Sequence, residues 1–124
     1  MIRLSLTTHS LQFIQDSTTS TSSVHCTVMY YDMLPHAEAS RDRVRGAPQF
    51  SLVSSATAVT ICSAPDFGVV REIDYINAYN TASTSSIGTI RINIDGTLRL
   101  QRTATLTSSG SLTWTPGAGW QSLT

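Results

Sequence analysis

The chain has 124 residues, the length of a single domain, and such a domain buries roughly two-thirds of the surface that its unfolded form exposes. Charged residues make up 13% of the chain, against about 25% in an average soluble protein, and the formal net charge is zero. This balance argues against a nucleic-acid partner, which a basic surface normally attracts, and no stretch approaches the ~20 apolar residues of a membrane-spanning helix.

The polar residues are of unusual kinds. All eight basic residues are Arg, Glu occurs only twice, and Ser and Thr together account for 36 residues. Interfaces between proteins favour Arg over Lys and Glu, which suggests a surface partly covered by other subunits. Codon or lineage bias is the alternative, and the many serines count against an interface, because Ser is depleted there.

The first residues alternate apolar and polar side chains, whereas a signal peptide is continuously apolar, so we expect the chain to be made and used without secretion. Cys26 and Cys62 lie within predicted strands, where a free Cys behaves as a small apolar residue. We expect reduced thiols in the core, since a disulfide would require the two strands to face each other.

Short alternating segments then follow along the chain, and they predict strands. The first two are expected over 2–7 and 11–15, before a flexible Ser/Thr loop over 17–23. The next, over 24–31, is partly apolar on both faces, which is typical of a central strand. Further strands are expected over 50–53, 57–63, 69–79 and 88–106, with the last of these ranges forming a hairpin, and from Leu112 to Leu123.

Two local features are predicted more closely. Ile73 falls out of phase with Ile76, which predicts a β-bulge near Asp74. In the hairpin, a two-residue loop at Asp95-Gly96 would place the apolar side chains of its strands on opposite faces. We therefore expect a three-residue loop, with Gly96 left-handed, that pairs Ile92 with Leu98.

Residues 32–49 have neither a helical nor a strand period and exceed the ~4–6 residues of a typical connection. This predicted long irregular loop holds Arg41, Arg43 and Arg45. A solvated loop and an arm that docks on a neighbouring subunit are both compatible with the pattern. The three arginines are the candidate partner-contact residues.

Eight or nine short strands without a helix predict an all-β fold, a single antiparallel β-sandwich of jelly-roll-like type that spans 1–124. The repeated Ser residues lack a Gly-x-Ser-x-Gly elbow, so no serine nucleophile is indicated. We expect no catalytic site, no metal site and no cofactor.

Three groups of side chains are possible sites. Glu72 and Asp74 are two apart on a strand, about 6–7 Å, a spacing compatible with glycoside hydrolysis, but the predicted bulge breaks it. Arg71 and the exposed face of a sheet explain these acids more simply. The histidines have no partner at metal-ligand spacing; they are His9, His25 and His36. The large aromatic residues either pack in the core or line a sugar-binding groove by stacking; they are Trp114, Trp120, Tyr75 and Tyr79.

About half of the chain carries a pattern of segments whose order and spacing resemble small virion proteins of tailed bacteriophages. The segments are Thr57–Pro65, Val70–Asp74, Ala78–Asn80, Leu106–Trp114 and Gly119–Gln121, together with the opening Ile2–Gln12. Residues 16–50 match no pattern of that family.

The resemblance implies a non-enzymatic structural protein of the virus particle, a capsid decoration or cement protein that bridges major capsid subunits and usually acts as a homotrimer. Its location would be the capsid surface of the virion, after synthesis in the host cytoplasm. The alternative is a module of the tail, fibre or baseplate that binds a host glycan or another tail protein. Exposed Trp or Tyr would mark that alternative.

Overall fold

The computed structural model describes residues 2–15, 24–33, 43–53, 57–94 and 96–123. These residues form eleven antiparallel strands in two sheets. The seven-stranded sheet contains β1 (Arg3–Leu4), β3 (Val24–Met33), β4 (Arg43–Arg45), β5 (Gln49–Val53), β7 (Val70–Asn80), β10 (Ser111–Thr115) and β11 (Gly119–Leu123). The four-stranded sheet contains β2 (Ser10–Gln15), β6 (Val59–Cys62), β8 (Ser86–Ile94) and β9 (Thr97–Leu106).

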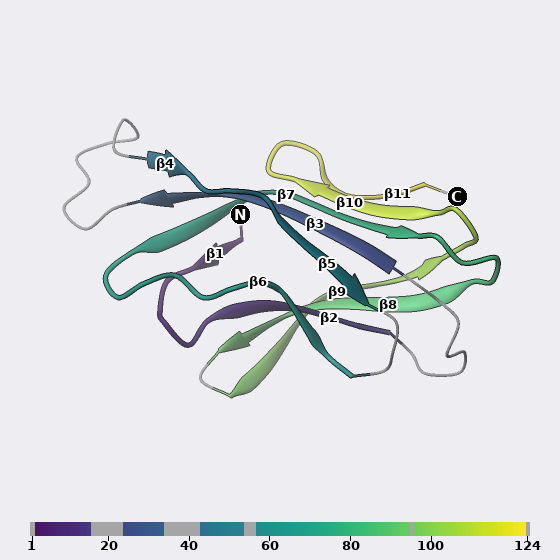
Figure 1. Cartoon of the computed structure of the whole chain (residues 1–124), viewed down its shortest axis with the longest axis horizontal. Helices are drawn as coiled ribbons and strands as arrows, with labels where there is room; N and C mark the ends of the chain where they lie inside the picture. Colours follow the sequence, from purple (N-terminus) through teal and green to yellow (C-terminus); the bar gives the residue numbers. More distant parts are fainter. Residues whose placement is uncertain (1, 16–23, 34–42, 54–56, 95, 124) are drawn as a thin grey trace.

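The two sheets lie one above the other (Figure 1), which confirms the expected all-β antiparallel β-sandwich. The larger sheet has the order β11-β10-β7-β3-β4, with β1 added to β7 and β5 added to β3. The smaller sheet has the order β6-β2-β8-β9. The long strands β3 and β7 therefore form the centre of the larger sheet, and both contribute to its two faces.

The core lies between the sheets and follows from the period of two along each strand. Val24, Cys26 and Val28 of β3 are fully or almost fully buried, as are Leu11 and Phe13 of β2. A side chain at Gly88 would meet the ring of Phe13, since an added Cβ would lie only 2.4 Å from it. Glycine in β8 thus makes room for the largest fully buried side chain of the core.

The predicted bulge in β7 is confirmed. Met29 of β3 pairs with Tyr75, and the next residue, Tyr30, pairs with Ile73, so Asp74 is the extra residue. The bulge lets Ile73 and Ile76 both point into the core although they are three residues apart.

The predicted register of the β8–β9 hairpin is wrong. Ile94 pairs with Thr97 and Ile92 with Arg99, so the loop has two residues, although Gly96 is left-handed as expected (φ 83°). Further along the hairpin, a register shift opposite Ile90 and Arg91 turns the apolar side chains of β9 back toward the core, where Leu106 is buried. Since β9 is an edge strand whose first residues are exposed, burial does not dictate the register there.

Part of the predicted irregular region 32–49 forms strands, whereas residues 34–42 lie outside the described residues. β3 runs on to Met33, β5 starts at Gln49, and the three residues of β4 pair with the end of β3. The loop expected over 17–23 lies outside the described residues. Short strands such as β1 and β4 raise the total above the eight or nine expected, because two or three residues are too few to show a period.

Cys26 and Cys62 are free and buried, as expected for core thiols. Burial raises the pKa of Cys26 from 9.0 to about 12. Burial also raises the pKa of Cys62, to about 11, although the nearby charge of Arg71 acts in the opposite direction. The folded protein therefore holds both protons at pH values where an unfolded chain releases them.

We predict that the free energy of unfolding falls as the pH rises from about 9 towards 11, because the unfolded state binds fewer protons there than the folded state. At pH 10.5 the loss for Cys26 is roughly 2 kcal/mol. Urea unfolding at pH 8 and pH 10.5 measures it. The double variant Cys26→Ala/Cys62→Ala is the control, and an equally steep fall in that variant would contradict the prediction.

Candidate partner-binding surface

The face of the seven-stranded sheet that points away from the four-stranded sheet is here called the outer face. Its side chains form cross-strand rows from β5 to β11. One row consists of Leu52, His25, Tyr79, Ser111 and Leu123. The next consists of Phe50, Thr27, Asn77, Thr113 and Gln121. None of these ten residues is Asp, Glu, Lys or Arg.

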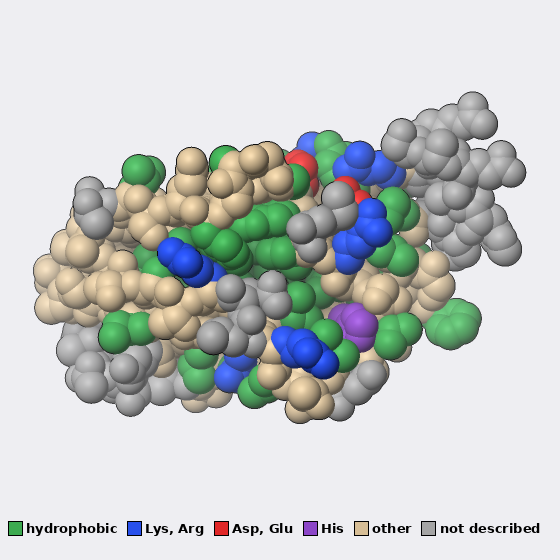
Figure 2. Space-filling view, turned by 180° about the vertical axis from the view of Figure 1, so that it is seen from behind, with side chains coloured by type: hydrophobic (Ala, Val, Ile, Leu, Met, Phe, Trp, Pro, Cys, Tyr) green, Lys and Arg blue, Asp and Glu red, His purple; other side chains and the backbone are tan. Residues whose placement is uncertain are grey.

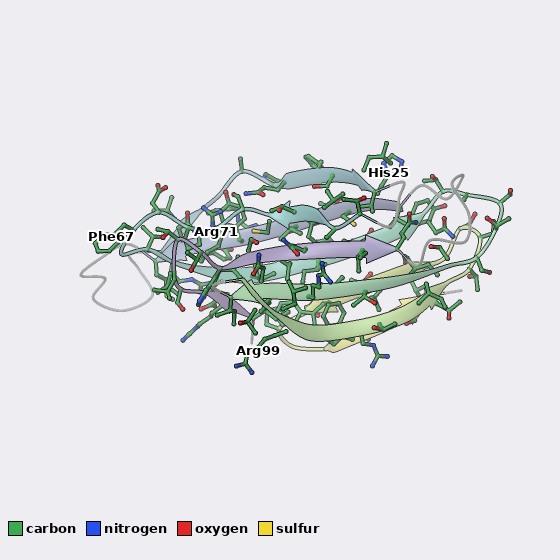
Figure 3. The ribbon with its side chains drawn as sticks, turned by 90° about the horizontal axis from the view of Figure 1, so that it is seen from below. His25, Phe67, Arg71 and Arg99 are labelled. Carbon is green, nitrogen blue, oxygen red and sulfur yellow. The ribbon has the colours of Figure 1, made fainter. Side chains whose placement is uncertain are left out.

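Large apolar side chains stand at the two margins of these rows. Phe50 on β5 is 75% exposed and Leu123 on β11 is 67% exposed, while Leu52 and Tyr79 are also exposed. Between the margins the surface is polar without charge, and Asn77 donates a hydrogen bond to Thr113 Oγ1 at 3.0 Å. Figure 3 shows His25 pointing away from the sandwich. An uncharged face with exposed aromatic and aliphatic groups is typical of a surface that another protein covers.

Beyond the bulge at Asp74 the character of the outer face changes. Arg43 and Arg45, two apart on β4, place their guanidinium carbons 4.2 and 4.4 Å from the ring centroid of Tyr31. Arg45 also donates a hydrogen bond to the Tyr31 hydroxyl. Cation–π contacts of this kind are worth about 0.5–1 kcal/mol at exposed sites, so the tyrosine holds both arginines in place.

Two carboxylates complete this arginine–tyrosine cluster, which comprises Tyr31, Arg43, Arg45, Glu72 and Asp74. Glu72 contacts Arg43 at 3.5 Å, and Asp74 contacts Arg45 at 3.4 Å. Arg3 from β1 reaches the other oxygen of Glu72 at 3.3 Å. Each carboxylate is thus engaged by arginine, as part of an ion-pair cluster on the outer face.

Of the three candidate arginines, the structure brings Arg43 and Arg45 together, whereas Arg41 lies outside the described residues. Both described arginines stand on the strand β4 and not in an irregular loop. Both lie on the outer face, and contact with a partner stays a prediction for them.

Arg71 differs from its expected position, because it is buried on the inner face of the sheet (Figure 3). It forms a two-pronged ion pair with Asp32, with Nε–Oδ1 at 2.8 Å and Nη2–Oδ2 at 3.0 Å. Its third nitrogen donates to the Ser63 carbonyl at 2.9 Å, and its guanidinium lies over the ring of Tyr30. Burial lowers the pKa of Arg71, but the hydrogen bond and charge of Asp32 outweigh that effect and raise it above its usual value.

The histidines singled out from the sequence do not come together in the part of the chain that the structure describes. His9 is buried, and its Nδ1 accepts a hydrogen bond from the Ser5 backbone N–H at 3.3 Å. His25 is exposed and His36 lies outside the described residues. No group of three or more potential metal ligands occurs among the residues that the structure describes.

The aromatic residues divide between the core and the outer face. Trp114 is buried and packs against the half-buried Trp120, with ring centroids 6.3 Å apart. Tyr75 and Tyr79 point outward on β7, and Tyr79 is 40% exposed. Seen from behind, apolar side chains gather in the middle of the molecule, with basic side chains around them (Figure 2).

Sequence reasoning missed Tyr31 as the residue that organises the arginines, and it missed the exposure of Phe50 and Leu52. The sequence shows Tyr31 only as the last residue of a predicted strand that is partly apolar on both faces, because its contacts depend on the pairing with Arg45. Phe50 and Leu52 belong to a strand in which alternation shows two faces without showing which one is covered.

The comparisons with known proteins give no relative. No family model, no curated protein and no solved structure matches the chain. Within the described ranges, none of which is helical, there is also no helix long and apolar enough to cross a membrane.

We predict that Asp32→Ala lowers the free energy of unfolding by about 3 kcal/mol, because it leaves the Arg71 guanidinium buried without its counter-charge. Asp74→Ala is the matched control. It removes a more exposed pair with Arg45 and should cost less than about 1 kcal/mol. Urea unfolding of both variants at pH 7 measures the difference, and equal losses would show that the Asp32–Arg71 pair has no special role in stability.

Proposed function

We propose that this chain is a non-enzymatic structural protein of a phage virion, a capsid decoration or cement protein that bridges major capsid subunits as a homotrimer. The observation that carries the proposal is the uncharged rows of the outer face, with Phe50, Leu52, Tyr79 and Leu123 exposed on them. A free protein gains nothing from exposing these side chains, whereas a protein that spends its working life on a particle covers them. The resemblance to small phage virion proteins supplies the kind of particle.

The arginine–tyrosine cluster supports a contact role at the charged end of the same face. Each arginine uses one nitrogen for its carboxylate contact, and a guanidinium has five N–H donors. Because Tyr31 and the carboxylates already hold Arg43 and Arg45, binding a carboxylate or carbonyl of a partner would cost little side-chain entropy. Fixed arginines next to an apolar surface are common at the centre of protein interfaces.

A cement protein works by adding contact area at many equivalent positions of a shell that packed DNA pushes outward. Each contact can be weak, since the subunits of an oligomer that engage neighbouring capsid subunits together bind much more tightly than one alone. A sheet face suits this task, because it offers a broad contact area. Net charge near zero then does little harm, as much of the surface is never free in solution.

A second candidate is a tail, fibre or baseplate module that binds a host glycan. The observation in its favour is the pair Tyr75 and Tyr79, which point outward on β7 on either side of Asn77. Rings on a flat sheet can stack on sugar rings, and an amide between them can hydrogen-bond hydroxyl groups. Against it, Trp114 faces the core.

Labelling of intact particles with a gold-tagged antibody against this protein tests the proposal. We expect gold over the head, because a cement protein occupies many equivalent positions on the capsid. Gold confined to the tail would overturn the capsid role and favour the glycan-binding or tail-protein module. Particles without label would overturn both.

A binding assay tests the surface itself. We predict that Leu52→Asp and Tyr79→Asp each weaken co-sedimentation with capsids at least tenfold, because each places a charge in an apolar contact worth more than about 1.4 kcal/mol. Thr105→Asp, at an exposed position of β9 in the other sheet, is the matched control and should bind normally.

The triple variant Arg41→Ala/Arg43→Ala/Arg45→Ala separates the two parts of the outer face. Weaker binding by this variant would add the arginine–tyrosine cluster to the contact. Normal binding would restrict the contact to the uncharged rows. Normal binding by the two Asp variants as well would remove the outer face from the proposal.

A further inference from the structure

Two tight turns lie at one end of the sandwich and present apolar side chains there. The turn between β1 and β2 closes with a hydrogen bond from the His9 N–H to the Leu6 carbonyl, at 2.9 Å. The turn between β6 and β7 closes in the same way, from the Val69 N–H to the Asp66 carbonyl, at 3.0 Å. Leu6 is 52% exposed, and Phe67 is 91% exposed.

The β6–β7 turn holds Phe67 in a defined position. Gly68 has a φ of +80°, the left-handed conformation that the third residue of a type II turn requires and that glycine adopts without strain. Phe67 precedes it at the tip of the turn and projects from the end of the molecule (Figure 3). A large apolar side chain left in water lacks the burial free energy that packing against a partner would supply, whereas a polar residue at this tip would lose none.

Beside Phe67 the surface is hollowed. The hollow has a volume of about 380 Å³, and its lining residues are uncharged: Ser5, Leu6, Thr7, Thr8, Phe67 and Gly68. Clefts of roughly 300–1,000 Å³ hold small molecules, so the hollow has room for an aromatic side chain. The same end of the molecule therefore carries both a projecting ring and a space that can receive one.

We propose that this end is a self-association surface, in which Phe67 of one copy enters the hollow beside Leu6 of the next. Phe67 itself lines the hollow, so in a closed ring each Phe67 borders its own hollow and occupies that of the neighbour. Identical surfaces that meet around an axis bring like charges together, and the uncharged lining avoids that repulsion. A second copy of this chain is thus the expected occupant, because it carries a projecting ring that fits the hollow and no charge that the lining would repel.

A projection beside a receiving hollow allows a two-fold dimer, in which each Phe67 enters the partner's hollow, and equally a heterologous contact that closes into a ring. Three copies would place three Phe67 rings around one axis. This deepens the proposed function, on which it rests for the number of three, by naming the surface that joins the trimer. Self-association itself is measurable on the purified protein without particles.

The first test is sedimentation velocity of the full chain over a wide range of concentrations. We expect the wild type to form trimers and Phe67→Asp to remain monomeric, with an unchanged circular dichroism spectrum because the side chain makes no core contact. Phe50→Asp is the matched control, since it changes the other highly exposed phenylalanine, on the outer face, and should still form trimers. A monomeric wild type, or trimers of Phe67→Asp, would overturn the proposal.

Cross-linking tests the contact between copies directly. Phe67→Cys protein is mixed with Leu6→Cys protein under mild oxidation, and a disulfide between the two chains is expected. Phe50→Cys mixed with Leu6→Cys is the control and should not cross-link. The native thiols of Cys26 and Cys62 are buried and do not compete.

The remaining outcomes are distinguishable. A dimer that Phe67→Asp dissociates would keep the surface and overturn the number of three. Association unaffected by Phe67→Asp but abolished by Phe50→Asp would place the contact on the outer face. If the protein forms trimers through Phe67 but the gold-tagged antibody does not label phage particles, this inference stands and the proposed function is overturned.

Discussion

The position of one extra residue, Asp74, in the central strand β7 determines which side chains the larger sheet buries and which it presents. Without it, a period of two would place Ile73 and Ile76 on opposite faces of the sheet. With it, both isoleucines are fully buried, while Glu72, Asp74 and Tyr75 all remain partly exposed. The bulge thus separates an uncharged stretch of the outer face from the charged cluster beyond it.

The same bulge organises two layers of charge at the end of the sheet. On the outer face Glu72 and Asp74 hold Arg43 and Arg45. On the inner face the next arginine, Arg71, pairs with Asp32 behind them. At this end of the sheet, ion pairs and tyrosine rings therefore lie on both faces. The price in desolvation is moderate, because only the inner pair is largely buried.

Much of this fold could be predicted from the sequence, because long strands with one covered face must alternate. The phase break between Ile73 and Ile76 was visible for the same reason, since burial leaves no other way to place both side chains in the core. The β8–β9 register was not predictable by that argument. Its loop end lies at an exposed edge, where Leu98 and Arg99 are both outside the core, and turn geometry decides the pairing instead.

The candidate site was predictable only in part. Arg43 and Arg45 are contact candidates from the sequence because they lie in a long segment without a strand or helix period, but their partners are set by contacts between residues far apart in the sequence. Arg45 meets Tyr31 because β4 folds back on β3, and it meets Asp74 only because β7 lies beside β3. The exposure of Phe67 also follows from tertiary structure. The segment Asp66-Phe-Gly68 indicates a turn, yet only the fold shows that the ring is 91% exposed.

The two surfaces proposed for binding lie on different parts of the sandwich, and this separation has a physical consequence. The outer face spans the strands from β5 to β11, whereas Phe67 projects from the end where β6 turns into β7. Copies joined through their Phe67 ends would leave every outer face free, so that three modest contacts could form on one particle at once. The second and third contacts would then form at a high effective concentration, and capsid affinity would depend on self-association without any direct contact of Phe67 with the capsid. A chain with few charges and weak individual contacts could bind a shell tightly in this way and still release it one contact at a time.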